Sequence, residues 1–318
     1  MPSDVVLVTG ATGFAGRHLL NGLNQAGTLV GWHRPDGQPP RYGRPISWQC
    51  IDLTRRDSVV GAIAEIGPTR IYHLAGAPNV AMSWSSAVSH LAVNALGTHH
   101  LLEGVRLSGR PCRVLVVSSA QIYRSSDEPI AEDAPLGPSN PYGLSKLAQD
   151  QLALNVARDD RLDVVLARPF NHVGPWQRPG FAVSSFARHI ARIERGLEPP
   201  RIRVGNLDAR RDITDVRDVV RAYVRIMEAG VTGRPYNVCS GRSWRIRDLL
   251  HELLSLATVP IDVEIDAARF RPNDVPVVQG DGSRIRSELG WAPSIRVEAT
   301  LGDTLDWWRE QIGRGEPA

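Results

Sequence analysis

The chain has 318 residues, 42% hydrophobic and 22% charged, which is typical of a globular protein with a large buried core. Its net charge of +3 is small and it has no basic run of five or more residues, so we expect no nucleic-acid partner. We find neither a secretory signal nor an apolar run near the ~18 residues of a membrane helix, so we expect no membrane association. Three widely spaced cysteines predict neither disulfides nor a metal site and fit a reducing cytoplasm.

Short apolar, β-branched runs alternate with segments of helical period in the first half of the chain. We expect strands within residues 4–10, 28–32, 46–53, 69–76, 112–120 and 162–170. A helical pattern at 87–109 should end at Gly109, and its apolar face comprises Val88, Leu91, Ala92, Ala95 and Leu102. Near-continuous apolar strands alternating with helices predict an α/β fold, a Rossmann-type doubly wound parallel sheet buried on both faces.

The sequence changes character after Phe170, because residues 171–180 are rich in glycine and proline and predict a loop. Helices within 181–196 and 216–230 then alternate with strands within 201–206 and 234–241, and two further helical patterns surround a short strand at 261–265. We therefore predict a Rossmann domain formed by residues 1–170 plus about 208–242. A smaller C-terminal α/β substrate domain would comprise about 171–207 plus 243–318.

A glycine-rich motif, TGATGFAG at residues 9–16, lies between the first predicted strand and a helix. Gly10, Gly13 and Gly16 would let the backbone approach a pyrophosphate, which then lies on the free N–H groups of the helix N-terminus. Its position after a strand and before a helix favours a dinucleotide site over a merely tight turn.

The end of the second predicted strand should distinguish the two nicotinamide cofactors. An acid there would bind a ribose hydroxyl, whereas the chain has His33 and Arg34, and an arginine suits a 2′-phosphate. We therefore expect NADP(H), with NAD(H) as the alternative if Arg34 is only a solvated loop residue. Asp52, after the third strand, fits two roles equally well: a hydrogen bond to the adenine amino group, or the N-cap of the next helix.

Lys146 is the only lysine in the chain and follows Tyr142 by four residues, so both would lie on one face of a helix. A nearby ammonium lowers the pKa of a phenol, which prepares tyrosine for proton transfer. Ser119 follows the fifth strand, at the edge where such sheets bind ligands. The three residues could reduce a carbonyl or oxidise an alcohol: Tyr142 transfers the proton, Ser119 hydrogen-bonds the oxygen, and Lys146 tunes Tyr142 and holds the nicotinamide ribose. The plain alternative is a solvated lysine on a helix surface.

With these motifs the sequence resembles the extended short-chain dehydrogenase/reductase family, which combines this trio with TGxxGFxG. The resemblance covers essentially the whole chain, including HLAG at 73–76 and Asn94. It implies a homodimer through the helices at about 86–108 and 142–158, although packing on the sheet explains their apolar faces equally well. The cofactor-binding residues that it implies are Gly10, Thr12, Gly13, Phe14, Gly16, Arg34, Asp52, Leu53, Leu74, Ala75, Gly76, Asn94, Tyr142 and Lys146.

Within that family, the stretches at 168–175, 204–223, 236–241 and 271–276 resemble the GDP-mannose branch, and in particular its reductases of GDP-4-keto-6-deoxymannose, which form GDP-D-rhamnose. The planar guanidinium groups of Arg211 and Arg271 could each donate two hydrogen bonds to the oxygens of a diphosphate, although a surface ion pair is the alternative for each arginine. The resemblance implies a GDP-sugar substrate, bound by Gln121, Asn171, Arg211, Arg271 and Asp274.

Gln121 bears on which reaction the chain performs. The 4,6-dehydratases of this branch carry a glutamate base at the matching position, and an amide cannot accept a proton at neutral pH. We therefore predict reduction of the C4 keto group of a GDP-4-keto-6-deoxyhexose by hydride from NAD(P)H. A nucleotide-sugar 4-epimerase with tightly bound NAD is the alternative, and a GDP-mannose 4,6-dehydratase is less favoured. Arg124 departs from the family pattern, which commonly has glycine there.

Overall fold

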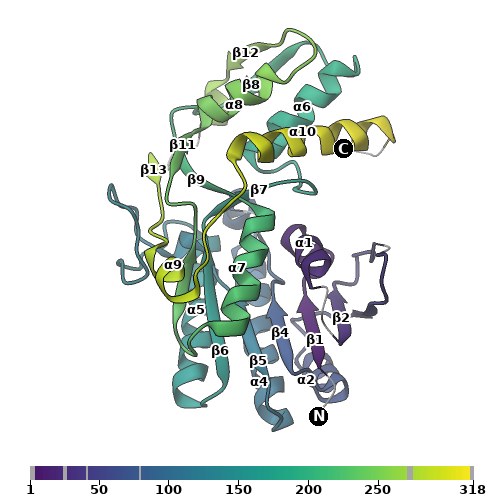
Figure 1. The fold of residues 1–318 in the computed structure, drawn as a ribbon, viewed down its shortest axis with the longest axis vertical. Helices are drawn as coiled ribbons and strands as arrows, with labels where there is room; N and C mark the ends of the chain where they lie inside the picture. Colours follow the sequence, from purple (N-terminus) through teal and green to yellow (C-terminus); the bar gives the residue numbers. More distant parts are fainter. Residues whose placement is uncertain (1–3, 24–26, 41, 79, 271–274, 316–318) are drawn as a thin grey trace.

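The computed structural model describes residues 4–23, 27–40, 42–78, 80–270 and 275–315. Its largest element is a seven-stranded parallel sheet in the order β10-β6-β5-β4-β1-β2-β3 (Figure 1). The strands are β1 (Val5–Thr9), β2 (Thr28–His33), β3 (Ser47–Cys50), β4 (Arg70–His73), β5 (Arg113–Val117), β6 (Asp163–Pro169) and β10 (Pro235–Val238). The predicted doubly wound sheet is confirmed, and its strand order reverses between β1 and β4, where such sheets bind their ligands.

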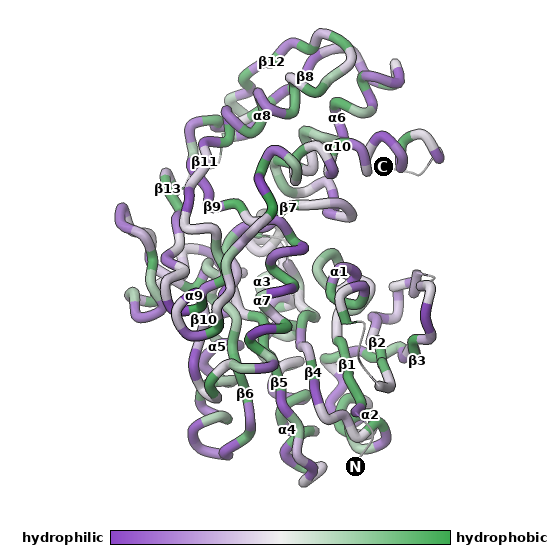
Figure 2. The backbone as a smooth tube through the Cα atoms, in the orientation of Figure 1, coloured by the Kyte–Doolittle hydropathy of each residue, from purple (hydrophilic) through white to green (hydrophobic). Residues whose placement is uncertain are grey.

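Helices cover both faces of this sheet because its strands are apolar on both sides. Along β1, Val6 and Val8 point into one core, while Leu7 points into the other. Figure 2 shows the result as hydrophobic strands in the middle of the sheet. No helix in the described ranges is long and apolar enough to cross a bilayer. One face carries α1 (Phe14–Gly22), α7 (Val216–Ala229) and α9 (Ser283–Leu289), and the other carries α2 (Arg56–Ile66), α4 (Gly97–Ser108) and α5 (Pro141–Asp159).

The helix predicted at 87–109 is continuous in the structure but contains one wider turn. A π-helical turn (Ala92–Leu96) separates α3 (Ala87–Leu91) from α4, which ends at Gly109 in the left-handed conformation, as predicted. The wider turn rotates the two helices relative to each other, so the predicted apolar face does not stay on the core side. Leu102 is buried, whereas Val88 is 81% exposed.

The second part of the chain forms its own layer above the carboxyl ends of the large sheet (Figure 1). Its core contains Phe186, Ile190, Leu249, Leu301 and Trp308. Strands β7, β9, β11 and β13 form a small sheet, and β8 pairs with β12. The elements are β7 (Asn171–Val173), β8 (Arg201–Val204), β9 (Arg210–Asp215), β11 (Ser243–Arg245), β12 (Asp262–Ile265), β13 (Val277–Val278), α6 (Ala182–Glu194), α8 (Ile246–Ser255) and α10 (Val297–Gly313).

The predicted domain division stays a proposal, and the structure suggests two refinements of it. Strand β9 falls in the range 208–242 assigned to the Rossmann domain, yet it belongs to the small sheet of the second part. Ile285, Leu289 and Trp291 lie in the predicted substrate domain, yet they pack into the core on the α1 and α7 face of the large sheet. The sequence pattern does not show which of the two cores this segment joins. We would count residues 283–291 with the first domain.

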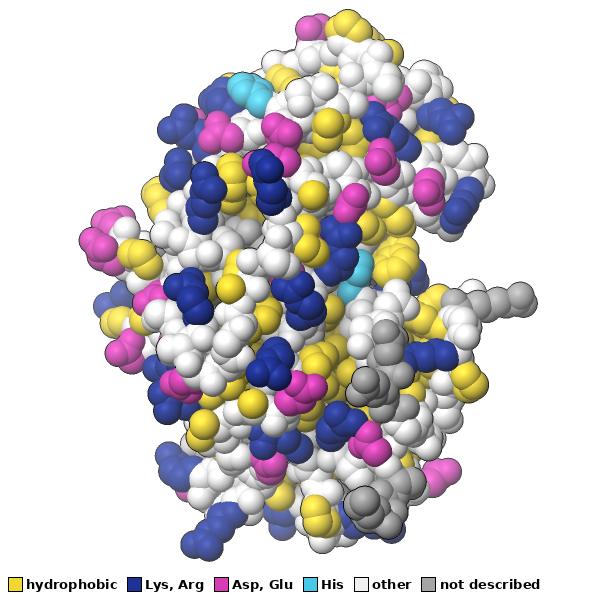
Figure 3. All heavy atoms as spheres, in the orientation of Figure 1, with side chains coloured by type: hydrophobic (Ala, Val, Ile, Leu, Met, Phe, Trp, Pro, Cys, Tyr) yellow, Lys and Arg dark blue, Asp and Glu magenta, His cyan; other side chains and the backbone are white. Residues whose placement is uncertain are grey.

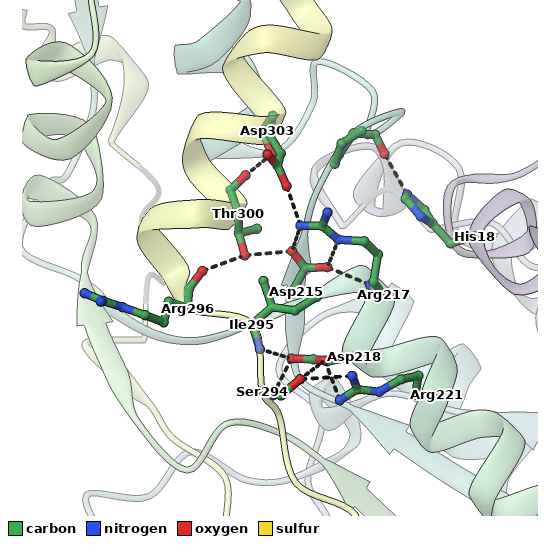
Figure 4. Close-up of polar contacts among 12 residues, drawn as sticks. His18, Asp215, Arg217, Asp218, Arg221, Ser294, Ile295, Arg296, Thr300 and Asp303 are labelled. Carbon is green, nitrogen blue, oxygen red and sulfur yellow. Dashed lines mark hydrogen bonds and ion pairs between the residues drawn. The ribbon is translucent and has the colours of Figure 1, made fainter. Parts of the chain in front are cut away.

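A polar cluster ties the two parts together where α7 begins. The Arg217 guanidinium lies between Asp215, at the end of β9, and Asp303 on α10, with Nη2–Oδ2 distances of 2.7 Å to each (Figure 4). Thr300 on α10 also donates to Asp215, at 2.7 Å. Two elements of the second domain are therefore fastened to the helix that packs on the Rossmann sheet.

Candidate active site

The predicted site residues gather at the carboxyl edge of the large sheet, below the second domain. Gly10 follows β1, Gly76 follows β4 and Ser119 follows β5, and these three strands are neighbours in the sheet. Figure 3 shows the surface hollowed between the two parts of the molecule, with hydrophobic and basic side chains along the border. The site that strand order alone would place at this edge is therefore built there.

The glycines of the first loop occupy positions that a side chain would fill. Gly10 has a φ of 65°, and a Cβ there would lie 2.8 Å from the Cα and N of Ala75. A Cβ on Gly16 would overlap the carbonyl oxygen of Gly10. A Cβ on Gly76 would lie 2.8 Å from Asn94 Oδ1, so the end of β4 is equally restricted. This bare backbone before the N-terminus of α1 fits a dinucleotide pyrophosphate.

The other expected cofactor residues line the same edge or its flanks. Leu53 is buried against α4, Leu74 packs partly into the first core, and Thr12 accepts a hydrogen bond from Arg17 at its carbonyl oxygen. Phe14 stacks on His172 with ring centroids 5.7 Å apart and planes inclined by 5°. This stacking joins the glycine-rich loop to the segment after β6 that leads into the second domain.

Two expected cofactor contacts are engaged within the protein. Arg34 is exposed, and its Nε pairs with Asp36 Oδ1 at 2.7 Å, so a phosphate would have to compete with that carboxylate. Asp52 Oδ1 accepts hydrogen bonds from the N–H and hydroxyl of Thr54, at 2.9 and 2.7 Å. It therefore stabilises the turn before α2, although the helix N-cap itself is Arg55.

Ser119, Tyr142 and Lys146 come together at this edge. The Ser119 hydroxyl lies near enough to Tyr142 to lower the pKa of its phenol, and Ser119 Oγ accepts a hydrogen bond from the Gln121 N–H. Tyr142 and Lys146 lie one turn apart in α5, which begins with Asn140 as its N-cap and Pro141 at its first position. The Lys146 ammonium is buried and donates to the Val117 carbonyl at 2.8 Å.

The electrostatics of the trio differ from the sequence-based expectation in one respect. Burial raises the pKa of Tyr142, and the hydrogen bond with Ser119 lowers it only in part. Burial lowers the pKa of Lys146 to about 7, against the opposing charge of Asp150 one turn further along α5. The expected lowering of the tyrosine pKa is therefore not the net direction here, because the ammonium is itself destabilised and donates to Val117 and Gln149.

The expected substrate residues are distributed between the two domains. Gln121 lies in a short 3-10 turn after β5, and its Oε1 accepts a hydrogen bond from Asn140 at 3.1 Å. Asn171 is exposed on β7 and pairs in register with Ile213 on β9, two residues after Arg211. Arg211 Nη1 donates to the carbonyls of Arg210 and Val275, at 2.8 and 2.7 Å. The remaining two expected residues, Arg271 and Asp274, lie outside the described residues.

A buried polar chain beside Lys146 was not predicted from the sequence. Gln149 accepts a hydrogen bond from Lys146 and donates to Thr98, which in turn contacts His73, and His73 contacts Thr9. All four are almost completely buried. Their sequence signal was weak: His73 stands in the quoted HLAG motif, and Gln149 lies one helical turn after Lys146. No group of three or more potential metal ligands occurs in the described part of the chain.

Comparisons with known proteins agree with this geometry. The family model described as GDP-mannose 4,6 dehydratase matches residues 7–304. GDP-6-deoxy-D-mannose reductase from Pseudomonas aeruginosa is 36% identical over 96% of this chain and 98% of its own. GDP-mannose 4,6-dehydratase from Vibrio cholerae is 26% identical over 96% of this chain and 93% of its own. The structure of RMD from Pseudomonas aeruginosa complexed with NADPH has 34% identity and a TM-score of 0.84, over 97% of this chain and 100% of that one.

Proposed function

This chain belongs to the GDP-mannose 4,6-dehydratase family, within the extended short-chain dehydrogenases/reductases, and from this premise we propose that it is an NAD(P)-dependent reductase of a GDP-4-keto-6-deoxyhexose. The observation that carries the proposal is that Ser119 and Tyr142 meet at the edge where the glycine-rich loop lies, with Lys146 one turn from Tyr142 on α5. The product would be a GDP-6-deoxyhexose such as GDP-D-rhamnose. The similarity of this chain to the GDP-6-deoxy-D-mannose reductase of Pseudomonas aeruginosa supports that choice.

Each residue of the trio has a role that its surroundings support. When bound, the reduced nicotinamide supplies the hydride that is transferred to C4 of the sugar. Tyr142 would give its phenolic proton to the carbonyl oxygen, because the raised pKa keeps it protonated and therefore able to donate at neutral pH. Ser119 would hydrogen-bond the same oxygen as negative charge develops on it. Lys146 has one donor left after its bonds to Val117 and Gln149, and this donor would hold the nicotinamide ribose.

Gln121 favours reduction over dehydration. Its oxygen accepts from Asn140, so its amide group is held in the 3-10 turn directly after Ser119. A dehydratase needs a carboxylate base at that position to remove a proton from C5 of the sugar, and an amide cannot serve. Substituting Gln121→Glu tests whether the missing base alone separates the two activities. We expect reduction to weaken and no dehydration of GDP-mannose to appear, since a carboxylate at position 121 does not by itself bring C5 of the sugar against it.

The deciding experiment is NADPH consumption with freshly generated GDP-4-keto-6-deoxymannose. The reductase would be supported by NADPH oxidation that depends on the keto sugar. This oxidation should be lost in Tyr142→Phe and should persist in a variant of an exposed residue, such as Gln151→Ala. The loss should be about a hundredfold or more, the usual contribution of a positioned acid. No oxidation, together with NAD that copurifies with the protein, would instead favour the 4-epimerase alternative.

We propose NADP(H) as the preferred cofactor and NAD(H) as the second. Arg34 lies at the end of β2, where it could reach a 2′-phosphate, and its ion pair with Asp36 is exposed and therefore weak. The similar RMD structure is a complex with NADPH. The measurement is KM for each cofactor in wild type and in Arg34→Ala, whose NADPH preference should disappear.

We propose a homodimer that forms through α3, α4 and α5. Val88 and Leu91 on α3 and Leu144 on α5 are exposed although apolar, and they lie on two helices that pack against each other. Sedimentation should give a dimer for wild type and for the control Leu256→Glu, but a monomer for Leu144→Glu.

The three cysteines are free thiols, which supports a cytoplasmic location.

A further inference from the structure

Lys146 is held by two neutral oxygens, and one of them belongs to a side chain that the reaction does not require. Its Nζ lies 2.8 Å from the Val117 carbonyl oxygen and 2.5 Å from Gln149 Oε1. Because an ammonium can only donate, Gln149 must present its oxygen to Lys146 and its NH₂ group to the other side. There, Nε2 donates to Thr98 Oγ1 at 2.8 Å.

The orientation of Gln149 is in turn fixed by three further buried residues. Thr98 Oγ1 donates its own proton to the Asn94 carbonyl at 2.6 Å, so it accepts from Gln149 and from His73 Nε2, the latter at 2.8 Å. His73 therefore carries its proton on Nε2, and its Nδ1 accepts from Thr9 Oγ1 at 2.8 Å. Burial lowers the pKa of His73 to about 3, so the ring stays neutral and the chain of bonds keeps one direction.

From this geometry we propose that Gln149 is a positioning residue, which is locked by Thr98, His73 and Thr9 and which holds the Lys146 ammonium in place beside Tyr142. The inference deepens the proposed reductase and rests on it for the role of Lys146. The Gln149 amide, at the end of this chain of hydrogen bonds, presents one acceptor oxygen in a fixed position and carries no charge. It therefore fixes the position of the Lys146 ammonium, but it stabilises the charged form of the lysine less than a carboxylate would.

The same chain connects the catalytic lysine to the cofactor loop. Thr9 is the last residue of β1, directly before Gly10, and its hydroxyl accepts from the Ala75 N–H at 3.1 Å. Ala75 is also the residue that a Cβ on Gly10 would strike. The position of Lys146 is therefore set by the same backbone that forms the proposed pyrophosphate site, through bonds buried inside the first domain.

The other ionisable groups around Lys146 and Tyr142 do not hide the influence of residue 149 on the Lys146 ammonium. Tyr223 on α7 interacts with Tyr142 only electrostatically, and His90 on α3 makes a T-shaped ring contact with Tyr142, with centroids 6.4 Å apart. Asp150 favours the charged form of Lys146, but its carboxylate is already paired with Arg168. A new charge at position 149 would be closer to Nζ than any of these. The titratable and charged groups near Lys146 and Tyr142 are Tyr142 itself and Asp150 on α5, His73 on β4, His90 on α3, Arg168 on β6 and Tyr223 on α7.

The sole lysine makes the first test direct, because protein labelled with NMR-active carbon at lysine Cε gives a single side-chain signal. Its titration reports the Lys146 pKa without any activity measurement. We expect Gln149→Glu to raise that pKa by about one unit or more, since a carboxylate replaces a neutral acceptor. Gln149→Leu should lower it, because the ammonium loses an acceptor. Gln151→Glu adds the same charge to an exposed position of α5 and should leave it unchanged.

The second test is the pH dependence of kcat/KM for keto-sugar reduction. The rate should fall as pH rises through the apparent pKa of the Tyr142–Lys146 pair, and Gln149→Glu should move this alkaline limb upward while Gln151→Glu does not. Coincident lysine titrations for Gln149→Glu and Gln151→Glu, in folded proteins, would overturn the proposal. A wild type that reduces no keto sugar, with the lysine titrations separated as expected, would refute the reductase and leave the positioning role standing.

Discussion

The ion pair between Arg168 on β6 and Asp150 on α5 should be one of the costliest in this protein to break. Arg168 Nε and Nη2 donate to the two oxygens of Asp150 at 3.0 and 2.7 Å, and the side chains are only 3% and 0% exposed. Arg168 Nη1 also donates to Tyr123 and to the Glu132 carbonyl, at 2.8 and 2.9 Å. The guanidinium is therefore fixed and cannot follow a lost partner into solvent.

Asp150→Asn keeps the shape of the side chain but removes its charge and turns an NH₂ group toward an arginine donor. Leaving one partner of a buried pair uncompensated costs about 3–5 kcal/mol. With a urea m-value of about 3 kcal/mol/M, the unfolding midpoint should fall by about 1 M or more. The variant should also lower the Lys146 pKa, because Asp150 stabilises that ammonium.

Glu103→Gln is the matched control, because Arg56 contacts Glu103 with the same two-pronged geometry, at 2.8 and 2.7 Å. That pair lies at the surface, where water replaces a lost partner, so its midpoint should move far less. Urea unfolding followed by tryptophan fluorescence compares the two variants directly. Equal shifts for both would show that burial does not set the cost of this pair and would refute the reasoning.

Three further predictions concern the cofactor loop, acid stability and cofactor choice. Gly10→Ala should abolish measurable NADPH binding in a fluorescence titration, because its Cβ meets backbone at 2.8 Å, whereas Gly109→Ala, with a similar φ of 62° and open space around it, should bind normally. Burial raises the pKa of Asp215, but hydrogen bonds from Arg217 and Thr300 outweigh burial and leave the pKa below 3.8. The ionised carboxylate therefore stabilises the folded protein fully above that pH, and this stabilisation is lost as the pH falls. In Asp215→Asn, the urea unfolding midpoint should accordingly depend less on pH in the acid range. Asp36→Asn should lower KM for NADPH severalfold and leave KM for NADH nearly unchanged, because a competing carboxylate is removed; an equal effect on both cofactors would contradict this.

The large sheet could be predicted because its strands are buried on both faces, which leaves a nearly continuous apolar run for each strand. Because the carboxyl ends of parallel strands lie at one edge of the sheet, Ser119 and the glycine-rich loop can be placed together from the sequence. The spacing of Tyr142 and Lys146 fixed their helical face in the same way. These inferences use only local periodicity and one topological rule.

The features that were missed depend on packing between distant segments. The π turn at 92–96 adds one residue to a turn, and a period of 3.6 residues read through Val88 and Leu102 cannot show it. Gln149 and His73 are 76 positions apart in the chain, and an isolated glutamine on a helix is usually solvated. The direction of the Tyr142 pKa shift also depends on burial, which residue spacing does not reveal.

Two buried cations on neighbouring elements show why this arginine-rich chain has a lysine at position 146. The composition gives 37 lysines plus arginines, of which Lys146 is the one lysine. Arg168 meets a carboxylate, a phenol and a carbonyl, and several donors in one plane suit that set of acceptors. Lys146 meets two single oxygens and has a pKa of about 7, a range that a guanidinium cannot reach. Position 146 thus needs a compact cation whose charge can be adjusted, and arginine there would keep the charge while losing both the fit and the adjustment.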